Sequence, residues 1–167
     1  MDRLFYYNTK IGRLGIREDG ESITHIYFRE PNIDAEIEAN KLVVQESYLT
    51  KRAYIQLKEY MEGQRKQFEL PLNPNGTEFQ RKVWNALTKI PYGETRSYKD
   101  IAIAVGNEKA SRAVGMANNK NPIPIIIPCH RVVGSNKKLV GYAGGLDLKE
   151  QLLSLEGILI DKNKVNK

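Results

Sequence analysis

The sequence is short of the residues that build disulfides and metal sites. Its 167 residues contain one cysteine, Cys129, and two histidines, His25 and His130. A single cysteine cannot form an internal disulfide, and these three residues offer too few ligands for a structural zinc ion. We therefore expect no metal ion, and a chain retained in a reducing compartment.

Long hydrophobic runs are also missing. No stretch approaches the roughly 18 consecutive apolar residues of a membrane span. Residues 1–7 lack the apolar run and the cleavage site of a secretory signal. These absences predict a protein with no membrane partner, in the cytoplasm of a prokaryote or in the nucleus if the source is eukaryotic.

Charge is divided unevenly along the chain, whose net charge is +6. Residues 1–74 carry a balance of −1, whereas residues 75–167 carry +7, of which the tail from Asp161 onward supplies only +2. A neutral first half followed by a basic second half favours a polyanion bound by the second half. The charge alone is also compatible with an ordinary, mildly basic domain.

The first half has the pattern of an α+β domain. Short β-compatible runs are broken by glycines, and two later stretches have helical spacing. The predicted strands cover residues 4–7, 11–17 and 23–28, and the predicted helices cover residues 34–40 and 50–61. A turn-rich segment at residues 71–76 marks a domain boundary. We predict domains at residues 1–74 and 75–167.

The second half is mostly helical. Apolar residues spaced for one helix face are Phe79, Val83, Trp84 and Leu87. Ser97, with Asp100 three residues on, resembles a capping box for a second helix that ends at Gly106. Asn107 can then cap a third helix through about residue 117. Two short helices joined by a tight turn form a helix-turn-helix pattern, which also occurs in ordinary helical cores.

The third predicted helix is unusual because small residues surround one arginine, Arg112. The small residues are Ala110, Ser111, Ala113, Gly115 and Ala117. Such a surface suits close approach to a nucleic-acid backbone or a narrow groove, into which Arg112 can insert. The alternative is tight packing against another helix, with Arg112 in solvent.

Cys129 stands beside His130 after the apolar run Ile123–Ile127. A free thiol has a pKa near 8.5, so a nucleophilic cysteine needs a base, and that base needs a group to orient it. In an extended segment neighbouring side chains point to opposite faces, so the pair would meet through a water unless the backbone turns. Glu156, where the last helix ends, is the candidate orienting group. The alternative is an exposed glutamate beside an ordinary glycine stop.

These segments together resemble the O6-alkylguanine-DNA alkyltransferase family. The resemblance covers residues 77–157 almost continuously, and the first half matches only in length and in its sheet and helices. Its motifs are Pro91-Tyr92-Gly93-Glu94, Ser97-Tyr98, Arg112-Ala113-Val114-Gly115, Asn121-Pro122-Ile123-Pro124, Pro128-Cys129-His130-Arg131-Val132-Val133, and Gly144-Gly145 with Glu156-Gly157. The family fold implies an α+β protein with a small ribonuclease-H-like N-terminal domain and a winged helix-turn-helix C-terminal domain.

The resemblance also implies the catalytic roles. Cys129 would accept the alkyl group, and His130 would act through a water as its base. Glu156 would hold the imidazole, Tyr98 would donate a proton to the departing guanine, and Asn121 would position the segment that carries the cysteine. No cofactor is implied.

The implied partner is double-stranded DNA that contains O6-alkylguanine. Arg112 would fill the gap left by the flipped nucleotide, since O6 lies inside the base stack, beyond the reach of a thiol. The other residues implied in DNA contact are Tyr98, Lys99, Asn107, Ala113, Gly115 and Ser135, and those around the base are Tyr142, Ala143 and Gly144. The expected reaction is one irreversible transfer by a monomer, with O4-alkylthymine as a lesser substrate.

Two other function classes fit parts of the sequence. A turnover hydrolase or acyltransferase could use Cys129 and His130, but it would leave Arg112 without a role. A sequence-specific helix-turn-helix protein could simply bury Cys129, and its thiol would then be inert toward O6-benzylguanine.

Overall fold

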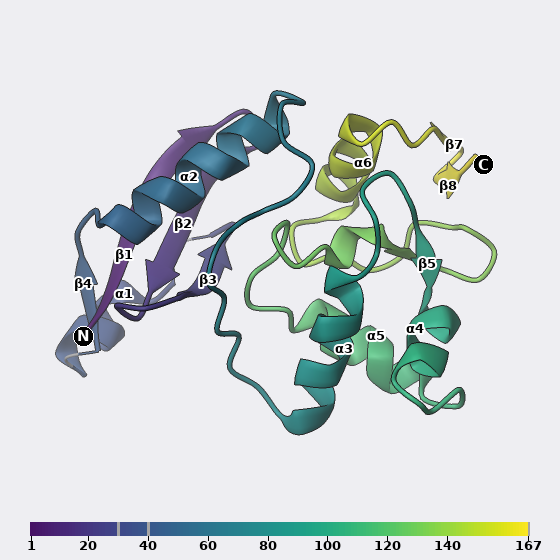
Figure 1. Ribbon diagram of the computed structural model, residues 1–167, viewed down its shortest axis with the longest axis horizontal. Helices are drawn as coiled ribbons and strands as arrows, with labels where there is room; N and C mark the ends of the chain where they lie inside the picture. Colours follow the sequence, from purple (N-terminus) through teal and green to yellow (C-terminus); the bar gives the residue numbers. More distant parts are fainter. Residues whose placement is uncertain (30, 40, 167) are drawn as a thin grey trace. The chain divides into compact units, whose positions relative to one another are not determined.

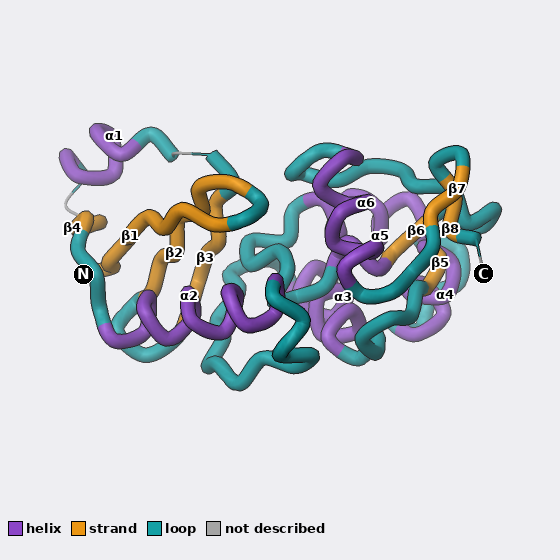
Figure 2. Tube along the Cα trace, turned by 90° about the horizontal axis from the view of Figure 1, so that it is seen from above, coloured by secondary structure: helices purple, strands orange, loops and turns teal. Residues whose placement is uncertain are grey.

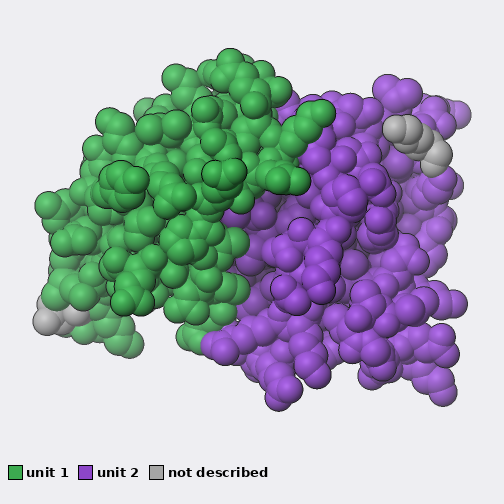
Figure 3. All heavy atoms as spheres, viewed as in Figure 1, with its two compact units in different colours: residues 1–75 green, residues 76–167 purple. Residues whose placement is uncertain are grey.

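The computed structural model describes residues 1–29, 31–39 and 41–166, which form two compact units. The N-terminal unit spans residues 1–75 and the C-terminal unit spans residues 76–167, as coloured in Figure 3. Within the described residues, none of the helices combines the length and the apolar character that crossing a membrane requires. The α+β class predicted from the sequence is confirmed.

The N-terminal unit is a four-stranded sheet in the order β3-β2-β1-β4, with helices. Its elements are β1 (Asp2–Thr9), β2 (Gly12–Glu18), β3 (Ile23–Tyr27), α1 (Ile33–Glu38), β4 (Leu42–Val44) and α2 (Tyr48–Met61). The first three strands are antiparallel neighbours, and β4 pairs with β1 in parallel. The three predicted strands are thus confirmed, and the sequence pattern missed β4.

Helix α2 lies across one face of this sheet (Figures 1 and 2). Ala53, Leu57 and Tyr60 are buried on α2, as are Leu4 on β1 and Ile16 on β2. A capping box between Ser47 and Thr50 starts α2 two residues before the predicted start. The predicted helix over 34–40 is observed as α1, and Asn40 lies outside the described residues.

The C-terminal unit is a helical bundle with short strand pairs. Its elements are α3 (Glu78–Thr88), β5 (Arg96–Ser97), α4 (Tyr98–Ala104), α5 (Ser111–Asn119), the 3₁₀ turn η1 (Cys129–Arg131), β6 (Val132–Val133), α6 (Leu146–Leu155), β7 (Ile160–Asp161) and β8 (Lys164–Val165). The apolar stripe of α3 is buried, and Trp84 Nε1 donates to the carbonyl of Ala117 on α5 over 2.8 Å. This bond ties the two helices together.

The helix-turn-helix pair is formed by α4 and α5. The predicted capping box is confirmed, because Asp100 N donates to Ser97 Oγ over 3.0 Å and Ser97 N donates to Asp100 Oδ2 over 2.8 Å. The predicted cap at Asn107 is wrong. Asn107 Oδ1 accepts from the nearby Lys109 N, which forms a local turn, so α5 begins four residues later, after Ala110.

The segment before the cysteine is not extended. Ile127 N donates to the Ile123 carbonyl over 2.9 Å, which closes a turn, and Ile125 has a φ of 74°. A positive φ is costly for a β-branched residue, so the surrounding packing must hold it in place. Ile125 is fully buried, and it supplies part of that packing. The turn continues into η1, which carries Cys129.

Candidate active site

Cys129 opens the 3₁₀ turn η1 and is only 3 % exposed. Its backbone is held on both sides: Cys129 N donates to the Ile127 carbonyl over 2.8 Å, and Asn118 Nδ2 donates to the Cys129 carbonyl over 3.3 Å. Because η1 turns, the extended geometry considered for Cys129 and His130 does not apply. The single thiol of the chain is therefore fixed inside the C-terminal unit.

The groups around the thiol of Cys129 shift its pKa in opposite directions. Burial raises the pKa of Cys129 above its ordinary value. Hydrogen bonds from Asn121 and Tyr142 and the charge of Lys149 act in the other direction, because each stabilises the thiolate. The net pKa stays raised, so the thiol needs a base to lose its proton.

His130 and Glu156 are in direct contact. His130 Nε2 lies 2.7 Å from Glu156 Oε2, and both side chains are fully buried. The pKa of His130 is lowered, chiefly because burial disfavours its charged form, although Glu156 acts in the opposite direction. His130 is thus a neutral imidazole at pH 7.

The contact with Glu156 also fixes which ring nitrogen of His130 can act as a base. A carboxylate only accepts hydrogen bonds, so Nε2 must carry the proton of a neutral imidazole. The basic lone pair then lies on Nδ1. In the Ser-His-Asp triad the orienting carboxylate holds Nδ1–H and leaves Nε2 basic, so the two ring nitrogens have exchanged roles in His130.

Glu156 is held as an anion by the guanidinium group of Arg131. Arg131 Nε donates to Glu156 Oε1 over 2.8 Å, and another Arg131 nitrogen donates to Oε2 over 3.0 Å. Burial alone would raise the pKa of Glu156, but the bonds and charges of His130 and Arg131 outweigh it and lower the pKa to about 2. Gly93 N also donates to Oε1 over 3.0 Å. The alternative of an exposed glutamate is wrong.

Lys149 is fully buried on α6. Its Nζ donates to the carbonyls of Val132, over 2.7 Å, Val140, over 2.8 Å, and Gly141, over 3.4 Å. Burial lowers the pKa of Lys149 to about 8, while the nearby Cys129 acts in the opposite direction. The ammonium group is therefore a buried positive charge close to the thiol.

Asn121 joins the α5 end to the cysteine segment. Its Nδ2 donates to the Ile127 carbonyl over 2.8 Å, and its Oδ1 accepts from Ile123 N over 3.0 Å. These two bonds fix the turn that precedes Cys129. Asn121 thus lies where a positioning residue would act.

Tyr98 and Tyr142 bring two phenols to the same site. Tyr98 Oη donates to the Val140 carbonyl over 3.1 Å. Burial, and then the charge of Cys129, raise the pKa of Tyr98, so the phenol keeps its proton at neutral pH. Tyr142 is half-buried and hydrogen-bonds to the thiol, whereas its neighbour Ala143 is exposed. Gly144, half-buried, follows in the same loop.

The residues predicted to contact DNA are mostly exposed. Exposed members of this set are Lys99, Asn107, Arg112, Ala113 and Ser135, and Gly115 is half-buried. The buried face of α5 consists instead of Val114, Ala117 and Asn118. The alternative of tight helix packing with Arg112 in solvent is observed in part, because Ala117 is buried against Trp84 of α3 while Arg112 is exposed. Arg112 forms no ion pair with any residue that the structure describes.

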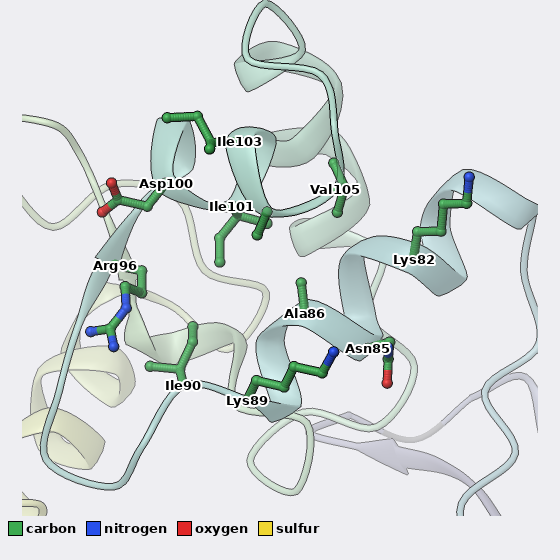
Figure 4. A pocket seen from close by; sticks show the side chains of 11 residues that line it. Lys82, Asn85, Ala86, Lys89, Ile90, Arg96, Asp100, Ile101, Ile103 and Val105 are labelled. Carbon is green, nitrogen blue, oxygen red and sulfur yellow. The ribbon is translucent and has the colours of Figure 1, made fainter.

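A hollow of about 680 Å³ opens between α3 and α4 (Figure 4). Lys82 and Asn85 line it from α3, and Asp100 and Ile103 line it from α4. None of the predicted site residues lines this hollow. It is separate from the residues gathered around Cys129.

Three residues of the site were missed from the sequence: Asn118, Arg131 and Lys149. Arg131 stands inside the motif that carries the cysteine, and a charged residue directly before the apolar pair Val132-Val133 was a usable signal. Lys149 looked like one more charge on an amphipathic helix. No group of three or more potential metal ligands occurs in the part of the chain that the structure describes.

Two family models match the chain. The one described as "6-O-methylguanine DNA methyltransferase, DNA binding domain" matches residues 78–158, and the one described as "6-O-methylguanine DNA methyltransferase, ribonuclease-like domain" matches residues 3–74. Together they account for both units.

Curated relatives and solved structures agree with this match. A methylated-DNA–protein-cysteine methyltransferase of Methanosarcina acetivorans is 50 % identical over 90 % of this chain and 96 % of its own length. The constitutive one of Bacillus subtilis is 47 % identical over 92 % and 96 %. The Mycobacterium tuberculosis OGT crystallised in complex with DNA is 40 % identical, covers 92 % of each chain and has a TM-score of 0.83. This chain belongs to the 6-O-methylguanine DNA methyltransferase family.

Proposed function

We propose that this protein repairs O6-alkylguanine in duplex DNA by transferring the alkyl group irreversibly to Cys129. The transfer of an alkyl group from DNA to a cysteine of the protein itself follows from the family. The observation that carries the assignment to Cys129 is that the chain has one cysteine. A protein-cysteine alkyltransferase with a single cysteine has only one acceptor.

The first chemical step is deprotonation of the thiol. Glu156 leaves the basic lone pair of His130 on Nδ1, and a water between Nδ1 and the thiol relays the proton. The charge of Lys149 and the hydrogen bonds of Asn121 and Tyr142 stabilise the thiolate. Arg131 acts one step further away, because it keeps Glu156 ionised.

The second step is an in-line displacement. The thiolate sulfur bonds to the alkyl carbon as the bond from that carbon to guanine O6 breaks. A guanine anion is a poor leaving group, and Tyr98 is the proton donor that neutralises it. Overall the thiol proton is transferred to guanine, and the cysteine becomes a thioether. No side chain near Cys129 can reverse a thioether, so each molecule reacts once.

The base must leave the helix to reach Cys129. Arg112 is exposed on α5 and fills the gap, while the small residues Ala113 and Gly115 let the helix approach the groove. Tyr142, Ala143 and Gly144 surround the flipped base. For Tyr98 to protonate guanine, the base must replace the Val140 carbonyl as the acceptor of its hydroxyl.

The proposed function also includes a second substrate, further DNA contacts and a monomeric state. O4-alkylthymine presents an alkylated oxygen in a similar place and is a lesser substrate. Lys99, Asn107 and Ser135 contact the DNA backbone. The protein acts as a monomer in the cytoplasm.

Stoichiometry tests the proposal. Excess duplex containing O6-methylguanine should lose one methyl group per protein molecule and then no more. Continued turnover would support the hydrolase or acyltransferase alternative. Tight binding of the duplex without loss of any methyl group would support the DNA-binding alternative.

A further inference from the structure

Met116 is a large apolar side chain on the open face of α5, where it is 69 % exposed. The opposite face of the helix supplies the core through Val114 and Ala117, which are fully buried. Met116 therefore contributes little to folding. Its apolar surface faces water, and a partner that covered this surface would gain hydrophobic binding free energy.

The neighbours of Met116 on this face are cationic. Arg112 precedes it by four residues, and Lys120, the C-cap residue directly after α5, follows it by four, so the three lie along one side of the helix. Both cations are exposed. Each step along this row is roughly 6 Å. The result is an apolar contact flanked by two positive charges, which matches a polyanion with an apolar interior.

The helix that presents Met116 is rigidly held. Trp84 Nε1 donates to the carbonyl of Ala117, the next residue, over 2.8 Å. On the other side, a methyl group on Gly115 would lie 3.8 Å from the ring of Tyr98, so the backbone of α5 already approaches α4 closely. Met116 is thus fixed in position while its own unbranched side chain can adapt to an irregular surface.

We propose that Met116 inserts into the minor groove of the substrate duplex, one helical turn from Arg112, as an apolar wedge beside the step that Arg112 enters. Proteins that bind this groove use apolar side chains, methionine among them, to unstack and bend the duplex. The contact holds the distorted duplex while the nucleotide is flipped. This proposal rests on the proposed function, since it takes α5 as the helix that faces DNA.

The test compares Met116→Ala, Met116→Leu and a matched control, Leu159→Ala. Leu159 is 67 % exposed and lies beyond α6. Two rates are measured: repair of O6-methylguanine in a limiting amount of duplex, and alkylation by free O6-benzylguanine. Met116→Ala should lower the ratio of duplex rate to free-base rate about tenfold, the size expected from losing one buried methionine contact. Met116→Leu should restore most of it, and Leu159→Ala should match the parent protein.

Salt dependence separates an apolar contact from a charged one. Because Met116 touches no phosphate, Met116→Ala should weaken duplex binding without changing the slope of log K against log salt. If Met116→Ala lowered the repair rate on duplex and the alkylation rate with free O6-benzylguanine equally, the role of Met116 would be structural and the proposal would be overturned. An unchanged ratio of duplex rate to free-base rate would also overturn the proposal, and this face of α5 would then be a candidate contact for a protein partner. If the parent protein does not repair O6-methylguanine in duplex at all, it is the proposed function that is contradicted.

Discussion

Tyr98 and Lys149 donate hydrogen bonds to the same carbonyl oxygen, that of Val140, over 3.1 and 2.8 Å. The proposed proton donor to guanine and the buried cation near the thiol are therefore joined through one peptide group. The same loop carries Tyr142, which hydrogen-bonds to Cys129. A base that replaces the Val140 carbonyl as the acceptor for Tyr98 would leave that carbonyl to Lys149 alone.

Replacing the cation tests its part in thiolate formation. Lys149→Met keeps most of the buried volume and removes the charge, so the pKa of Cys129 should rise further. A rise of one unit would lower the thiolate fraction at pH 7 about tenfold. The rate of alkylation by free O6-benzylguanine should fall accordingly, and its pH profile should move to higher pH. An unmoved profile would exclude Lys149 from this role.

Tyr98 can be tested separately from the thiol. Tyr98→Phe removes the proton donor, so transfer from O6-methylguanine should slow by roughly 10²–10⁴-fold, the usual contribution of a general acid. Because the phenol is uncharged at neutral pH, the rate of Cys129 with iodoacetamide should hardly change. A parallel loss with iodoacetamide would indicate a damaged pocket instead of a lost donor.

The Glu156 network should make stability depend on pH in acid. The pKa of Glu156 is about 2 in the folded protein against 4.5 ordinarily, so the unfolded chain binds more protons between these values. The stabilisation is complete above about pH 4.5 and is lost as the pH falls toward 2. Denaturant unfolding of the parent protein over this range should show that loss.

Glu156→Gln is the matched variant for this experiment. At pH 7 it should lower the free energy of unfolding by about 3–5 kcal/mol, because Arg131 and its buried charge lose their carboxylate. The difference in free energy of unfolding between the parent protein and Glu156→Gln should narrow as the pH falls from 4.5 to 2. A constant difference would contradict the assigned ionisation of Glu156.

A substitution at Gly115 should affect stability and DNA repair in opposite directions. A Cβ at this position would meet the ring of Tyr98 at 3.8 Å, an ordinary contact, so Gly115→Ala should be tolerated. It should raise the free energy of unfolding by roughly 0.5–1 kcal/mol through helix propensity. If α5 must approach DNA closely, repair of duplex should nevertheless slow while free-base alkylation is kept. Faster or equal duplex repair would argue against close approach at Gly115.

Local patterns were enough to predict most elements of the fold. The β-compatible runs of β1 to β3, the stripe of α3 and the capping box of Ser97 each depend on residues close in sequence, and each is observed. The short strands β4, β5 and β6 were missed because they depend on distant partners: β4 pairs with β1, and β5 pairs with β6. The cap predicted at Asn107 is wrong because the Asn107 side chain accepts from Lys109 N in a local turn, and the sequence does not rank such a turn against a helix cap.

In the site too, some contacts were predicted from the sequence and others, which depend on the fold, were not. The pair of His130 and Glu156, which lie 26 residues apart, was predicted from the end of the last helix and again from the resemblance. Arg131 and Lys149 were not foreseen. Their roles arise from burial and from which carbonyls and carboxylates face them, and charged residues are exposed by default.

Intact and peptide-resolved mass after incubation with duplex containing O6-methylguanine tests the central claim most directly. Transfer to Cys129 requires one added methylene per molecule, located on the peptide that contains Cys129, and no addition in Cys129→Ala. An unmodified parent protein, or a methylene found on any other residue, would contradict it.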